Sequence, residues 1–176
     1  MAPQTTMSVK DGLLAEFDHE MATTRKHLEH VPDDKLSWTP HDKSMTLGRL
    51  ASHLAECPGW TGAMTDQDEF DIAPPDGSFD YQPADFGTRA EIVDNFDKSV
   101  ADARDKIAAK SDTELMAPWN FKKGGEVMFT VPKMVAIQNH VIKHAIHHRG
   151  QISVYLRQVG APVPQTYGPT ADFPDM

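Results

Sequence analysis

The chain has 176 residues, with 17 Lys or Arg, 26 Asp or Glu and 39% hydrophobic residues, so its formal net charge is −9. This acidic balance argues against a nucleic-acid partner and an anionic-membrane surface, because both bind clustered positive charge. The single cysteine excludes an intramolecular disulfide framework and a four-thiolate metal cluster. No apolar run approaches the ~18 residues of a membrane span. The start of the chain shows no secretory signal pattern, so we expect one cytoplasmic domain over 1–176.

The first half of the chain predicts two amphipathic helices and a long loop. Apolar residues recur every three to four positions over 8–30, which is typical of one helix face, and Pro32 ends that helix. Thr46 can cap a second helix, which the Pro-Gly pair at 58–59 kinks or ends. The segment 67–87 is rich in proline and glycine and therefore predicts a long loop.

The second half predicts two further helices separated by a hairpin-like excursion. Thr88 and Glu91 match a capping box at the start of the third helix. Residues 118–132 break the helical pattern and suggest a small hairpin. The fourth helix ends before Gly160, and the Pro-rich tail 161–176 is expected to lie extended on the body. The pattern as a whole favours an all-α four-helix bundle, whose sites form from inward-facing side chains.

Histidine is the unusual residue of this sequence: the chain has nine, and four lie within 140–148. At 100° per residue, His144 and His148 fall on or beside the apolar stripe of the fourth helix, whereas His140 and His147 fall on its flank. A pair at i and i+4 can place two imidazole nitrogens on one metal ion. The alternative is that both are hydrogen-bonded core residues.

The surroundings of this pair favour neutral imidazoles. No Asp or Glu lies between Glu126 and Asp172, so no local carboxylate stabilises protonated histidine, and a divalent cation fits better. His53, on the second helix, is the best candidate for a third ligand. Three protein ligands plus water form an open, catalytic type of site. Residue 145 is Ala rather than Glu, which removes the built-in general base of a zincin.

Three residues near His53 have alternative interpretations. Glu56 lies three positions later and could accept a hydrogen bond from the His53 ring or act as a base, which makes it the one candidate catalytic residue. Cys57 is interpreted as a small buried hydrophobe. Trp60 is interpreted as core packing, with a pocket wall as the alternative.

Three segments together resemble the DinB-like (DinB/YfiT) superfamily. They are KSMTLGRLASHLAECPGW, NHVIKHAIHHRGQISVYLRQVGAPVP and QTYGPTADF, and they occur in this order over most of the chain. The resemblance implies an up-down-down-up four-helix bundle that often forms homodimers. It also implies a divalent metal site, commonly zinc or nickel, with His53, His144 and His148 as the ligands.

Two classes of function follow from the resemblance and the histidines. Some members of this superfamily are metal-dependent transferases of low-molecular-weight thiols such as bacillithiol or mycothiol, so the first hypothesis is a metal-dependent S-transferase acting on a small molecule. If the ion activates water instead, the protein is a hydrolase. The second hypothesis is a non-catalytic dimeric protein that binds metal or a small ligand in a stress response. No nucleic-acid or membrane partner is expected.

Overall fold

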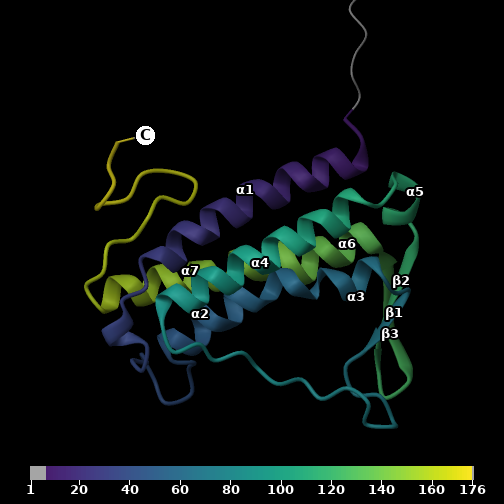
Figure 1. The fold of residues 1–176 in the computed structure, drawn as a ribbon, viewed down its shortest axis with the longest axis horizontal. Coiled ribbons are helices and arrows are strands. Elements are labelled where there is room, and N and C mark those ends of the chain that lie inside the picture. The colour runs from purple at the N-terminus through teal and green to yellow at the C-terminus, as the bar shows by residue number, and fades with distance from the viewer. Residues whose placement is uncertain (1–6, 176) are drawn as a thin grey trace, which may run out of the picture.

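The computed structural model describes residues 7–175 and shows the predicted all-α four-helix bundle (Figure 1). The bundle is formed by α1 (Val9–Glu29), α2 (Leu47–Glu56), α4 (Arg89–Ala108) and the consecutive α6 (Lys133–Ile137), π-helix (Gln138–Ile142) and α7 (Lys143–Gln158). The last helical segment thus contains a π-helical turn between two α-helical parts. Helices α1 and α2 each pack against both α4 and α7.

The helix directions follow the up-down-down-up order. In Figure 1, α1 and α7 run one way along the bundle, and α2 and α4 run the other way. A long connection between α3 (Gly62–Thr65) and α4 returns along the whole bundle, which allows α2 and α4 to run parallel. The sequence predicted that this connection is wholly a loop. That prediction is wrong in part, because the connection contains strand β1 (Glu69–Asp71). The strand forms through parallel pairing with the distant β2 (Pro118–Lys123), which no local pattern reveals.

The hairpin-like excursion is confirmed as β2 (Pro118–Lys123) and β3 (Glu126–Pro132), which complete a sheet in the order β1-β2-β3. Its turn needs glycine, since Gly124 and Gly125 have φ values of 66° and 83°. The Pro-Gly pair does end α2, and a 3-10 turn (Cys57–Thr61) and α3 follow. Two other short helices, Asp33–Lys35 and α5 (Asp112–Leu115), were not predicted from the sequence.

Side-chain caps explain where the long helices begin. The side chains of Ser8 and Thr46 accept hydrogen bonds from backbone N–H groups in the first turns of α1 and α2. Thr88 and Glu91 form the predicted capping box at the start of α4. At the other end of the chain, Gly160 has φ +77° just after α7, as the sequence predicted.

The core lies between the inner faces of the four helices, and the C-terminal tail adds Val163 to it. Phe17, Phe96 and Ile152 are buried there. A buried ion pair joins Arg149 to Glu20 at 2.7 Å. Among residues 7–175, no helix combines the length and the apolar character needed to cross a membrane.

Candidate metal centre

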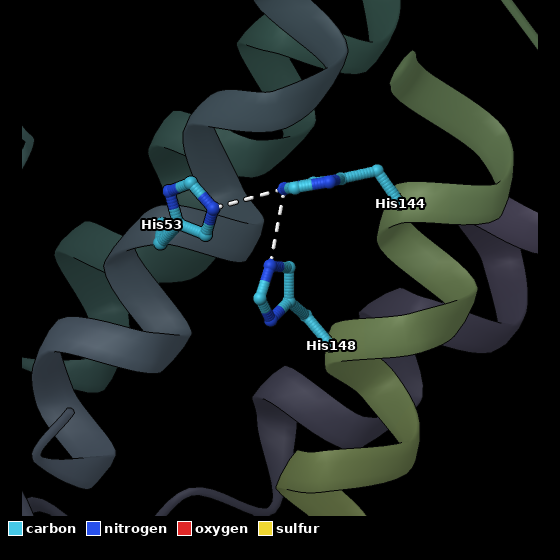
Figure 2. A group of neighbouring side chains, drawn as sticks. All are labelled: His53, His144 and His148. Atoms are coloured by element: carbon cyan, nitrogen blue, oxygen red, sulfur yellow. Dashed lines mark hydrogen bonds between the residues drawn. The ribbon is translucent and has the colours of Figure 1, made fainter. Parts of the chain in front are cut away.

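Three histidines from two helices converge inside the bundle (Figure 2). His53 lies in the last turn of α2, and His144 and His148 lie one turn apart on α7. The Nε2 atom of His144 is 3.0 Å from Nε2 of His53 and 3.1 Å from Nε2 of His148. Each residue offers one ligand atom, and these three atoms lie within 4.8 Å of one another. The structure therefore brings together the three predicted ligands.

Hydrogen bonds on the far side of two rings fix their orientation. Nδ1 of His53 donates to the Glu56 carboxylate at 2.9 Å, and Nδ1 of His148 donates to the Gln151 side-chain oxygen at 2.7 Å. Carboxylate and amide oxygens only accept, so the proton of each ring lies on Nδ1. In the neutral rings this leaves the Nε2 lone pairs of His53 and His148 directed towards the common centre.

Glu56 is held by several partners. Its carboxylate accepts hydrogen bonds from the Tyr81 hydroxyl and from the Ala84 backbone N–H at 3.1 Å, and Arg49 lies 3.5 Å away. Burial alone would raise the pKa of Glu56, but the hydrogen bonds from His53, Tyr81 and Ala84 outweigh it, so this pKa is lowered. Glu56 is therefore placed to accept the hydrogen bond from His53 as an ionised carboxylate. That Glu56 is a catalytic residue stays a prediction.

The lowered pKa values of His144 and His148 keep these two imidazoles neutral. Burial lowers the pKa of His144 to about 4, with further contributions from the neighbouring His148 and His53. Burial is also the main reason that the pKa of His148 is lowered. Neutral imidazole is the form that binds a metal ion.

The donor set fits a divalent cation. With His53 and His148 both presenting acceptor lone pairs, Nε2 of His144 can donate a proton to only one of them, whereas a cation satisfies all three nitrogens. Zinc–nitrogen bonds of about 2.0–2.1 Å in a tetrahedral site correspond to nitrogen–nitrogen separations of roughly 3.3 Å. The two separations that involve His144, 3.0 and 3.1 Å, require only a small expansion, and the third pair lies within 4.8 Å.

Two residues that follow α2 border the cluster. The ring of Trp60 lies 5.3 Å from that of His53 and 5.2 Å from that of His144. Trp60 packs against the core and also lines a pocket, so both interpretations of this residue apply. Cys57 is buried, its thiol donates to the His53 carbonyl oxygen, and burial raises its pKa. Cys57 is therefore a small buried residue, as predicted.

The two flanking histidines lie outside the three-histidine cluster. His140 lines the adjacent pocket, and His147 is exposed with its ring 4.9 Å from that of His148. Sequence reasoning missed Gln151 and Tyr81. A polar residue three positions after His148 is a signal that could have found Gln151. Nothing local points to Tyr81, which reaches Glu56 from the long connection.

The comparison with protein families decides the relationship that the fold and histidines suggest. A model described as "DinB family" matches residues 5–175. The chain belongs to the DinB family. YrdA of Bacillus subtilis, an uncharacterized protein, is 26% identical over 165 residues, which cover 92% of this chain and 90% of YrdA.

Solved structures agree with the DinB-family fold. A DinB-like protein from Bacillus cereus has a TM-score of 0.71 and 22% identity, with 92% of this chain and 99% of that chain covered. YfiT from Bacillus subtilis has a TM-score of 0.61 and 14% identity, with 91% and 94% covered. YfiT is described as a probable metal-dependent hydrolase with an unusual four-helix bundle topology. These TM-scores establish a shared fold.

Proposed function

We propose that this DinB-family protein is a metal-dependent enzyme that transfers a low-molecular-weight thiol to a small electrophile. The observation that carries the proposal is the convergence of three Nε2 atoms within 4.8 Å, from His53, His144 and His148. We propose zinc or nickel as the ion, because both are divalent metals that imidazole ligands bind well. Three protein ligands also leave room for a substrate at a zinc-type site.

An ion held by these three histidines would supply Lewis-acid chemistry, which would lower the pKa of a thiol at neutral pH. In the overall reaction, the thiol loses its proton to solvent and a sulfur–carbon bond forms. The bond from that carbon to the leaving group breaks, and the leaving group departs with the bonding electron pair. The protein's own contribution is to bring three imidazole nitrogens together and to fix the orientation of the His53 and His148 rings through Glu56 and Gln151.

The environment of Glu56 favours a thiol over water as the nucleophile. A water nucleophile usually needs a general base, and Glu56 is the carboxylate that contacts the cluster. Its oxygens already accept hydrogen bonds from His53, Tyr81 and Ala84. A thiol that coordinates the ion needs no such base.

Metal-dependent hydrolysis is the second candidate, and the similarity to YfiT favours it. YfiT is described as a probable metal-dependent hydrolase, and it shares this bundle with a TM-score of 0.61. A hydrolase would use the same three histidines. The two candidates differ in whether turnover depends on an added thiol.

The test uses untagged full-length protein loaded with zinc or nickel. Monochlorobimane is the electrophile, and bacillithiol, mycothiol, glutathione and cysteine are each offered as the thiol, while p-nitrophenyl acetate tests hydrolysis. We expect thiol-dependent conjugation that is lost after chelation and in His148→Ala, and kept in the exposed matched control His147→Ala. If no thiol supports turnover above the uncatalysed rate, the transferase proposal is wrong. Metal-dependent ester cleavage in the same samples would then support the hydrolase.

A further inference from the structure

A large pocket lies beside the three-histidine cluster, and residues of β1 and β2 help to line it. Figure 1 shows these strands at one end of the bundle. The volume of this pocket is about 610 Å³, which is in the range of small-molecule sites. It lies between the turn after α2, the returning connection and the hairpin. Aromatic side chains make most of its wall: Trp60, Phe70, Phe79, Tyr81, Trp119 and Phe121.

Two rings of the wall, those of His140 and Phe121, lie nearly parallel, with centroids 5.6 Å apart and planes 15° apart. Phe129 is not one of the residues that line the pocket, but its ring supports both: it lies 6.0 Å from that of His140 and 5.0 Å from that of Phe121, with planes 10° and 15° apart. Such a set of parallel faces suits a flat ring, because aromatic groups prefer offset-stacked or edge-to-face contacts.

The wall carries no formal charge. The lining residues of this pocket include no Asp, Glu, Lys or Arg, although charged residues make up 24% of the chain. Burial lowers the pKa of His140, which keeps its ring uncharged at neutral pH. A charged ligand would therefore lose its hydration without gaining a charged side chain of opposite sign in the wall. A neutral ligand does not have this cost of burying an unpaired charge.

Two residues connect the pocket to the cluster. Trp60 lines the pocket while its ring lies 5.2 Å from that of His144. Tyr81 lines the pocket while its hydroxyl donates to Glu56, the residue that orients His53. Trp60 and Tyr81 therefore belong both to the pocket wall and to the immediate surroundings of the three histidines.

We propose that this pocket binds an uncharged, planar aromatic group, and that this group belongs to the electrophile on which the histidine centre acts. The first half of the proposal stands on the pocket alone, and the second half rests on the proposed function. The substrate class is accordingly a neutral aryl compound rather than an anionic or aliphatic one.

Binding is tested first on metal-free protein, by calorimetry with three matched probes: 2-naphthamide, the anion 2-naphthoate and the aliphatic cyclohexanecarboxamide. We expect 2-naphthamide to bind at least about tenfold more tightly than the other two. Phe79→Ala should weaken its binding about three- to tenfold, because it removes one aromatic contact. Phe173→Ala is the control, since Phe79 and Phe173 are equally exposed, at 38%, and Phe173 lies in the C-terminal tail. Equal binding of the three probes, or unchanged binding in Phe79→Ala, would overturn the aromatic assignment.

The position of the bound aromatic probe relative to the three-histidine centre is tested with manganese. In Mn²⁺-loaded protein, the protons of bound 2-naphthamide should relax faster than in Zn²⁺-loaded protein, and His144→Ala should abolish the difference while keeping the calorimetric binding. A ligand that binds with no relaxation difference in protein shown to hold Mn²⁺ would overturn the link to the centre. Failure of the protein to hold Mn²⁺ or Zn²⁺ would instead contradict the proposed metal-dependent function, and the calorimetric result would still decide the aromatic pocket.

Discussion

Nδ1 of His53 donates a hydrogen bond of 2.9 Å to the carboxylate of Glu56, three residues further along the chain. This contact spans the end of α2, so the same short segment supplies both a candidate ligand and the group that orients it. The anionic partner also makes the Nε2 atom a stronger electron donor. The properties of the centre should therefore depend on Glu56 even though its carboxylate is directed at the outer nitrogen of the ring.

Glu56→Gln tests this dependence. The substitution keeps the size of the side chain and removes its negative charge, and we expect metal affinity to fall about 10- to 100-fold, as for other residues that orient metal-binding histidines. Competition against a chromogenic chelator measures the change. Glu126→Gln, at the exposed start of β3, is the matched control. An affinity equal to that of the unmodified protein would show that Glu56 does not tune the centre.

The buried pair of Arg149 and Glu20 should contribute strongly to stability. The Arg149 side chain is 1% exposed and also donates to the Tyr167 hydroxyl, which ties the C-terminal tail to α1 and α7. Arg149→Met leaves the Glu20 carboxylate buried without its cation, and we expect unfolding in urea to require about 3–5 kcal/mol less free energy. Arg104→Met, which breaks an exposed pair with Asp18, should change little. Similar losses in the two variants would contradict this account.

His27 makes the stability of the metal-free protein depend on pH. Burial lowers its pKa below the ordinary value of 6.5, and its Nδ1 donates to the Thr23 carbonyl oxygen at 3.0 Å. The unfolded chain then binds the proton more readily than the folded chain, so stability is lost as pH falls below about 6.5. We expect His27→Gln to make the loss between pH 7 and pH 5 smaller, as measured by urea unfolding in the presence of EDTA. A larger loss in the variant, or an unchanged one, would contradict this sign.

Regular periodicity explains why much of the fold and the cluster could be predicted. His144 and His148 lie on the inner side of a helix, where 100° per residue places them, and the cap at Thr46 follows directly from its residue type. His53 required more than periodicity. Its choice among the other histidines rested on its place in the second helix and on the family resemblance.

The pocket could not be predicted because its walls come from segments that meet only in the folded chain. β1 pairs with β2 across about fifty residues of sequence, and this pairing brings Phe70 towards Phe121. The π-helical turn at Gln138–Ile142 also departs from regular helix geometry where His140 meets the hairpin. Neither feature has a periodic signal, which is why the sequence placed His140 only on a helix flank.

Elemental analysis of untagged protein tests the central claim most directly. The unmodified chain, purified in the presence of zinc or nickel and then dialysed, should hold one divalent ion per chain. His144→Ala should hold none, and His147→Ala, which removes an exposed histidine of the same helix, should still hold one. A metal-free unmodified chain, or equal metal content in His144→Ala, would contradict the account.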